Sequence, residues 1–240
     1  PFIVYLLPII SIFLSSYLRE ASGTTKKISE SNRTSAIVAG KQSDTGDFIN
    51  RKRLVQLMAF YGLCTYLVII VSFNLPFLME EYHFSSGNSG IMISLFFLAI
   101  MTPGLFLNQI IGWWKQRTEF YSLLCIAVGL GLIILSRSEW WIGLGCLFAG
   151  FGYGVIQPVV YDKTTRTASS RKVTLALAFV MAMNYLAILL CPFIIDWAGF
   201  IFRVHTQQFA FIFNLVVTVL AAGWAYWKRN SFVFSENTEE

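Results

Sequence analysis

The stretch Trp141–Lys172, WIGLGCLFAGFGYGVIQPVVYDKTTRTASSRK, decides the fold of this chain. Its first two thirds are apolar and rich in glycine, and a Gln157–Pro158 step then leads into a loop rich in Lys and Arg. An apolar helix of about 20 residues crosses a bilayer core, and glycines let neighbouring helices approach closely. Loops rich in Lys and Arg mark the cytoplasmic side of a membrane. The stretch therefore predicts a membrane-spanning helix whose C-terminal end faces the cytoplasm.

The composition extends this prediction to the whole chain. Of its 240 residues, 56% are hydrophobic and 13% are charged, whereas a soluble domain has about 25% charged residues. The net charge of +5 lies in the gaps between apolar runs, which indicates membrane topology and not a nucleic-acid-binding face. The four cysteines lie inside apolar runs without a CxxC motif, so we expect buried thiols and no metal or cofactor.

Seven apolar runs predict an all-α membrane protein. The run at residues 1–18 is barely long enough to cross a bilayer, so we expect a helix that is truncated at its start. The polar residues 19–53 predict a cytoplasmic linker, and residues 229–240 predict a cytoplasmic tail. Between them we expect a six-helix transmembrane domain over residues 54–228. Its apolar runs cover residues 54–78, 89–112, 119–136, 140–161, 173–196 and 205–227.

The orientation follows from the distribution of Lys and Arg. When the gaps between runs are assigned to alternate sides, 16 of the 18 Lys and Arg residues fall on the side of the linker and the tail. Because such residues accumulate in cytoplasmic loops, we predict a multi-pass protein of the cell membrane with its linker and C-terminus in the cytoplasm.

The order of these segments resembles the second half of a major facilitator superfamily transporter, in which a long cytoplasmic loop precedes helices 7 to 12. The segment Gly112-Trp-Trp-Lys-Gln-Arg117 is similar to the G-x-x-x-D-R loop of that family, although Gln116 stands at the position of the family's Asp. The resemblance implies a bundle of helices 7–12 preceded by the end of helix 6, with an N-terminal half outside this chain as its partner. It also implies a cytoplasmic gating motif of Gly112, Arg117 and Asp162, in which Asp162 pairs with Arg117.

Two further segments resemble the drug–proton antiporter branch of the family. They are Ser72–Leu78 (SFNLPFL) and the Cys191–Pro192 step. This likeness implies multidrug efflux by alternating access, with a small-molecule substrate and with protons or another ion as the coupling partner. Since no acid, base or histidine lies near the centre of any of the six runs, we expect the titrating acid in the missing half.

Polar, aromatic and Met residues within the runs are the candidates for the wall of a substrate cavity. Tyr153 and Gln157 stand four residues apart on one side of their predicted helix, and an amide that faced lipid would be costly. For Gly150 and Gly154 we expect tight packing, and for Asn184 a cavity role and an interhelical hydrogen bond are equally open. The candidate cavity residues are Thr65, Tyr66, Asn74, Met101, Tyr153, Gln157, Asn184 and Tyr185.

Three other functions are alternatives to export. A metabolite symporter would share the same fold. A seven-helix receptor fits the number of runs, but its long loop would follow the first helix and its last helix has no Lys for a retinal. An enzyme is not predicted, because no P-loop, HExxH or G-x-S-x-G motif occurs and the segment GFGYG lacks the glycine spacing of a dinucleotide site.

Overall fold

The computed structural model describes residues 48–227, apart from residues 115–116, 136 and 205. The predicted helix at residues 1–18, the linker as far as residue 47 and the tail at residues 229–240 lie outside the described residues.

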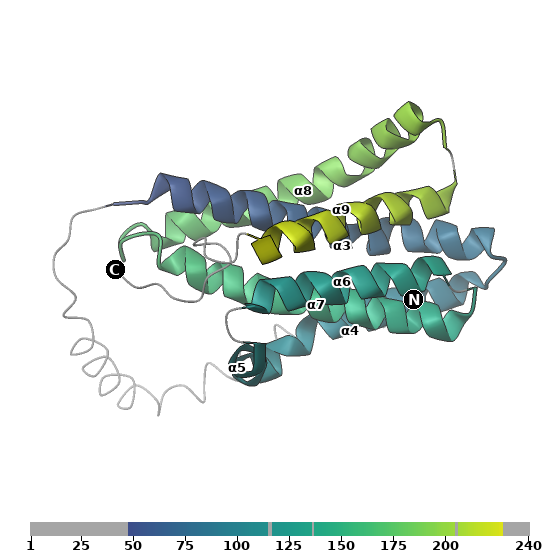
Figure 1. The fold of residues 1–240 in the computed structure, drawn as a ribbon, viewed down its shortest axis with the longest axis horizontal. Helices are drawn as coiled ribbons and strands as arrows, with labels where there is room; N and C mark the ends of the chain where they lie inside the picture. Colours follow the sequence, from purple (N-terminus) through teal and green to yellow (C-terminus); the bar gives the residue numbers. More distant parts are fainter. Residues whose placement is uncertain (1–47, 115–116, 136, 205, 228–240) are drawn as a thin grey trace, which may run out of the picture. The chain divides into compact units, whose positions relative to one another are not determined.

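The described part of the chain is almost entirely helical (Figure 1). Six of its helical segments are long and apolar enough to cross a membrane, which confirms the predicted all-α membrane bundle. The helices are α3 (Arg51–Glu81), α4 (Ser86–Met101), α5 (Pro103–Trp114), α6 (Thr118–Leu135), α7 (Glu139–Thr165), α8 (Val173–Phe202) and α9 (Gln207–Trp227).

One predicted helix is divided in the structure. The apolar run at 89–112 forms α4 and α5, which meet at Thr102. Pro103 has no backbone N–H to continue the ladder of α4, and Phe106 has the non-helical angles φ −122° and ψ 17°. As a result α5 lies across the direction of the other helices (Figure 1). The membrane-crossing segment covers Gly87–Leu107 and ends before Gly112.

A short backbone clip joins the start of the bundle to the α7–α8 loop. The Asn50 backbone N–H donates to the Thr167 carbonyl at 2.9 Å, and the Ser169 N–H donates to the Phe48 carbonyl at 3.0 Å. These bonds form an antiparallel bridge between Ile49 and Ala168. The Asn50 side chain also caps α3 by accepting from the Arg53 N–H. The two segments therefore lie together at one end of the bundle.

Helix α7 packs tightly between α4 and α6. A Cβ atom added at Gly150 or Gly154 would lie less than 3.0 Å from the backbone oxygen of Phe96 or Ile100 in α4. A Cβ atom at Gly145 would meet the backbone of α6 in the same way. These glycines allow the close approach of helices that the sequence predicted.

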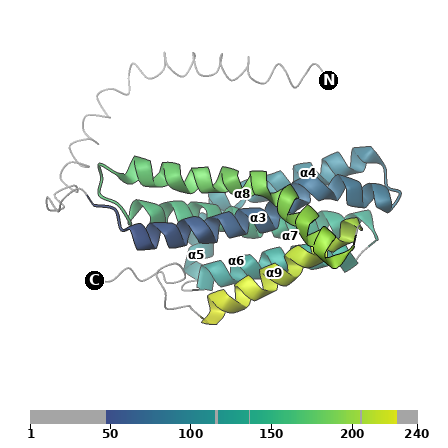
Figure 2. The ribbon, with the colours of Figure 1, turned by 90° about the horizontal axis from the view of Figure 1, so that it is seen from above.

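Helix α3 packs against α4, α7, α8 and α9, as Figures 1 and 2 show from two directions. Two thirds of its most apolar window is buried, whereas only 17% is buried in the corresponding windows of α4 and α8. The buried faces of α3 and α7 thus pack against α4 and α8, two helices of which little is buried. The candidate site lies where these four helices converge.

Candidate functional site

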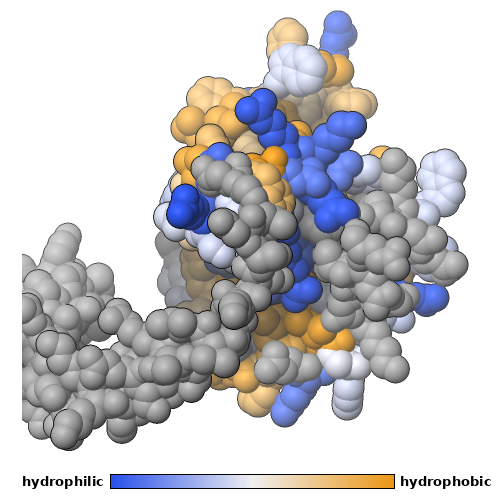
Figure 3. Space-filling view, turned by 90° about the vertical axis from the view of Figure 1, so that its left-hand side faces the viewer, coloured by the Kyte–Doolittle hydropathy of each residue, from blue (hydrophilic) through white to orange (hydrophobic). Residues whose placement is uncertain are grey.

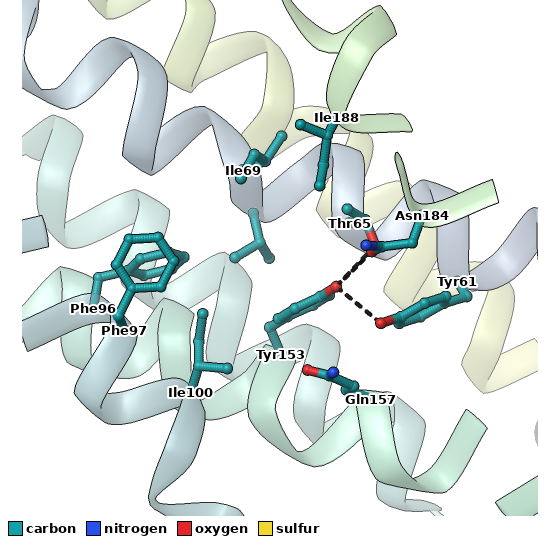
Figure 4. A pocket seen from close by; sticks show the side chains of 11 residues that line it. Tyr61, Thr65, Ile69, Phe96, Phe97, Ile100, Tyr153, Gln157, Asn184 and Ile188 are labelled. Atoms are coloured by element: carbon teal, nitrogen blue, oxygen red, sulfur yellow. Dashed lines mark hydrogen bonds between the residues drawn. The ribbon is translucent and has the colours of Figure 1, made fainter. Parts of the chain in front are cut away.

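A cavity of about 230 Å³ lies between α3, α4, α7 and α8. Figure 4 shows that its polar and apolar groups lie on different sides. Among the described residues that line it there is no Asp, Glu, Lys, Arg or His. The lining residues are Tyr61, Thr65, Val68, Ile69, Phe96, Phe97, Ile100, Tyr153, Gln157, Asn184 and Ile188.

A hydrogen-bonded triad from three helices forms the polar side. The Thr65 hydroxyl donates to the Asn184 Oδ1 atom at 2.7 Å. The Tyr153 hydroxyl lies 3.0 Å from the same amide oxygen and 2.9 Å from the Thr65 Oγ1 atom. Figure 4 shows this hydroxyl pointing toward both partners. These contacts use the amide oxygen of Asn184, so its NH₂ group is the part of the triad that can donate to a ligand.

Two further tyrosines and an amide extend the polar side. The rings of Tyr61 and Tyr153 are nearly parallel, with centroids 6.1 Å apart, and their hydroxyl oxygens are 3.3 Å apart. The Tyr61 hydroxyl also lies 3.2 Å from that of Tyr161, to which the Gln157 Nε2 atom donates at 3.5 Å. The chain of hydroxyls orients Tyr153 and Gln157 along one wall of the cavity.

Aromatic and aliphatic side chains form the opposite side. The rings of Phe96 and Phe97 meet edge to face with centroids 5.2 Å apart, and Ile100 lies beside them (Figure 4). Such a surface binds flat or branched apolar groups through burial and aromatic contacts. The cavity can therefore hold one molecule with an apolar end and an uncharged polar end.

The structure brings four of the eight predicted cavity residues together, namely Thr65, Tyr153, Gln157 and Asn184. The other four lie elsewhere. Tyr66 is buried against α8, where the Cys191 thiol lies 4.0 Å from its carbonyl oxygen. The side chains of Met101 and Tyr185 are 73% and 68% exposed and are not part of the cavity lining.

Asn74 lies in a second cavity, of about 390 Å³, between α3, α8 and α9. Its Nδ2 atom donates to the Gln207 Oε1 atom at 3.4 Å, and Asp196 lines the same cavity. Asn74 is thus separated from the triad, although the sequence predicted a cavity role for it as well.

The predicted gating residues have separate partners in this structure. The Arg117 guanidinium lies over the ring of Tyr226, 5.9 Å from its centroid. Asp162 forms an ion pair with Arg166 at 2.8 Å, one turn further along the chain. Gly112 is exposed in α5, with open space where a Cβ atom would lie.

Sequence reasoning missed a buried ion pair between Glu119 and Lys163. The side chains are only 6% and 11% exposed, at the start of α6 and near the end of α7. The sequence indicated this pair only in part. Helices α6 and α7 are antiparallel and joined by a short turn, so the start of α6 lies beside the end of α7. Which residues meet depends on the rotation of each helix, which is fixed here by the glycine contacts of α7.

The comparison with protein families finds a match to the model described as the Major Facilitator Superfamily, over residues 2–192 and over residues 57–237. The search of curated proteins found no match.

Proposed function

Because the chain belongs to the Major Facilitator Superfamily, whose members are membrane transporters, we propose that it forms the C-terminal half of a secondary transporter. In this proposal the complete transporter exports amphipathic, drug-like small molecules in exchange for protons. Membership of this family favours transport over the receptor function that the number of apolar runs also allowed.

The observation that carries the proposal is the uncharged, two-sided cavity. Its Thr65–Tyr153–Asn184 triad offers hydroxyl and amide groups, while Phe96 and Phe97 offer aromatic surface. A phosphate or dicarboxylate substrate would need an Arg or Lys that the described lining does not supply. An amphipathic molecule with one hydrogen-bonding group fits the lining without leaving a buried charge unpaired.

Transport would follow the alternating-access scheme, in which two halves rock about a site near the bilayer midplane. The cavity lies between α3, α7 and two sparsely buried helices, so an N-terminal half could complete its open side. The acid that exchanges protons is then expected in that other half, since the lining described here has none.

The cytoplasmic gate remains part of the proposal. Arg117 and Asp162 are exposed at helix ends, and their contacts with Tyr226 and Arg166 are surface contacts. Surface contacts of this kind contribute little free energy, so exchange of partners during rocking is energetically accessible. We place the linker and the C-terminus in the cytoplasm of a cell-membrane protein on the Lys and Arg bias.

A metabolite symporter is the second candidate. The amide groups of Asn184 and Gln157 favour it, because they suit a small neutral metabolite as well as a drug. The two candidates differ in the direction of proton movement: in export, substrate leaves as protons enter, whereas in symport both move together.

The experiment is transport of Nile red, an uncharged amphipathic dye, by the full-length protein in proteoliposomes with an imposed pH gradient. Asn184→Ala removes the amide of the triad and is expected to lower the initial rate at least tenfold. Tyr185→Ala is the matched control, because the neighbouring side chain is 68% exposed and outside the cavity lining. Equal rates for both variants would show that the transported substrate does not bind in this cavity.

A further inference from the structure

The α3 start and the α7–α8 loop together form a strongly basic surface at one end of the bundle. We define this basic surface by six residues of the two segments, Arg51, Lys52, Arg53, Arg166, Arg171 and Lys172. The segments are more than a hundred residues apart in the sequence, and the antiparallel bridge between Ile49 and Ala168 holds them together. In Figure 3 hydrophilic residues gather on this end and hydrophobic residues border them.

The basic surface is not neutralised by the described carboxylates. Asp162 is the acid nearest in sequence, and it pairs with Arg166. Glu119 is buried in its pair with Lys163. The other described acids, Glu80, Glu81, Glu139 and Asp196, lie at or near the ends of α3, α7 and α8 remote from this surface. Among the described residues a positive excess therefore remains, and Arg51, Lys52 and Arg171 are exposed.

In a bilayer crossed by these helices, the surface would lie at the level of the lipid headgroups. Helix α3 begins at Arg51 and α8 begins at Val173, so the cations stand directly beside the ends of two membrane-crossing helices. Clusters of four to eight Lys and Arg residues beside a membrane helix attract anionic headgroups. Long basic side chains can lay their stems along apolar surface and keep their charges at headgroup level.

We propose that this basic surface is a binding site for the headgroups of anionic phospholipids. Membrane orientation depends only on how many Lys and Arg residues lie on each side. A binding site also needs them to be close together, and here the bridge brings cations from two distant segments onto one surface. The bonds from Asn50 to Thr167 and from Ser169 to Phe48 fix the two backbones before any lipid arrives. Such preorganisation favours specific binding over diffuse attraction. The proposal depends on the membrane fold and not on drug export.

The test is the retention of phosphatidylglycerol and of phosphatidylcholine, offered at equal concentration to the full-length protein in detergent and counted by native mass spectrometry. The wild-type protein is expected to retain phosphatidylglycerol preferentially. Removing four cations of the surface should lower its apparent affinity at least tenfold, since each cation contributes about fivefold near a charged membrane. The surface variant is Arg51→Gln, Lys52→Gln, Arg171→Gln and Lys172→Gln.

A matched control removes the same charge from the predicted linker by Lys26→Gln, Lys27→Gln, Arg33→Gln and Lys41→Gln. This control should retain phosphatidylglycerol like the wild type. Equal losses in both variants would show that net charge alone attracts the lipid, and would overturn the site. If the surface variant does not fold, Arg171→Gln with Lys172→Gln serves instead, with a smaller loss expected.

The acidic residues Glu236, Glu239 and Glu240 would be the competing occupant of the basic surface. Neutralising Glu236, Glu239 and Glu240 to Gln should leave lipid retention unchanged if lipid headgroups are the ligand. A rise in retention in that variant would show that the tail, and not lipid, occupies the surface in the unaltered protein, and would thereby overturn the proposal that lipid is its native ligand. Raising the salt concentration should weaken retention by the wild type, because screening shortens the range of these charges.

Discussion

The Glu119–Lys163 pair allows a sharp prediction about stability. Lys163→Met removes the cation and leaves the Glu119 carboxylate in a site where its side chain is 6% exposed. Removing one partner of a buried pair costs about 3–5 kcal/mol, because the remaining charge is desolvated without compensation. For a chain of this size that loss lowers the midpoint of thermal unfolding by on the order of 10 °C.

A second, exposed ion pair in the same chain provides the comparison with the buried pair. Asp162 and Arg166 form a pair whose side chains are 60% and 52% exposed, and an exposed pair contributes about 0–1 kcal/mol. Arg166→Met should therefore lower the midpoint by a few degrees at most. The double variant Glu119→Gln with Lys163→Met removes both buried charges and should regain most of the lost stability.

The assay is thermal unfolding of the purified full-length protein in detergent, followed by tryptophan fluorescence. It compares the wild type with Arg166→Met, Lys163→Met, Glu119→Gln and the double variant Glu119→Gln with Lys163→Met. A double-mutant cycle then gives the interaction energy of Glu119 with Lys163. The reasoning is refuted if Lys163→Met costs no more than Arg166→Met, or if the double variant is as unstable as Lys163→Met alone.

Three further predictions concern packing, the gate and the cavity. Gly154→Ala should destabilise the bundle by about 1–3 kcal/mol in the same unfolding assay, because its Cβ atom would meet the Ile100 backbone, whereas Gly131→Ala, in open space, should not. Arg117→Ala should reduce Nile red transport while leaving membrane insertion intact, and wild-type flux would exclude Arg117 from the gate. Tyr153→Phe removes the hydroxyl shared with Thr65 and should shift the relative rates for a panel of dyes; an unchanged panel would make that hydroxyl structural.

Much of the fold follows from hydropathy, because each crossing segment must satisfy its backbone bonds within itself. That constraint makes an apolar run a reliable sign of a helix, and the six segments confirm it. The division at Thr102 was missed, since the apolar residues Met101 and Leu105 continue the run on both sides and the short Thr102–Gly104 segment does not interrupt its hydropathy.

The site followed from the sequence only in part. Tyr153 and Gln157 were found because their spacing and the cost of a lipid-facing amide together indicate an interior face. Periodicity gives the angle of a residue around its own helix but not the neighbour that it meets. For this reason Tyr185 was chosen beside Asn184, although only Asn184 contacts Thr65 in the structure.

The most direct test of the cavity as a substrate site is protection from thiol labelling. Ile188→Cys, at a lining position without a hydrogen bond to lose, and Leu189→Cys, whose native side chain is 62% exposed and outside the lining, are made in a Cys125→Ser background, in which the other cysteines of this chain are buried. If the cavity binds substrate, Nile red will slow labelling by a methanethiosulfonate reagent at position 188 and not at position 189. Labelling that the dye leaves unchanged at 188, or slows equally at both positions, would contradict the account.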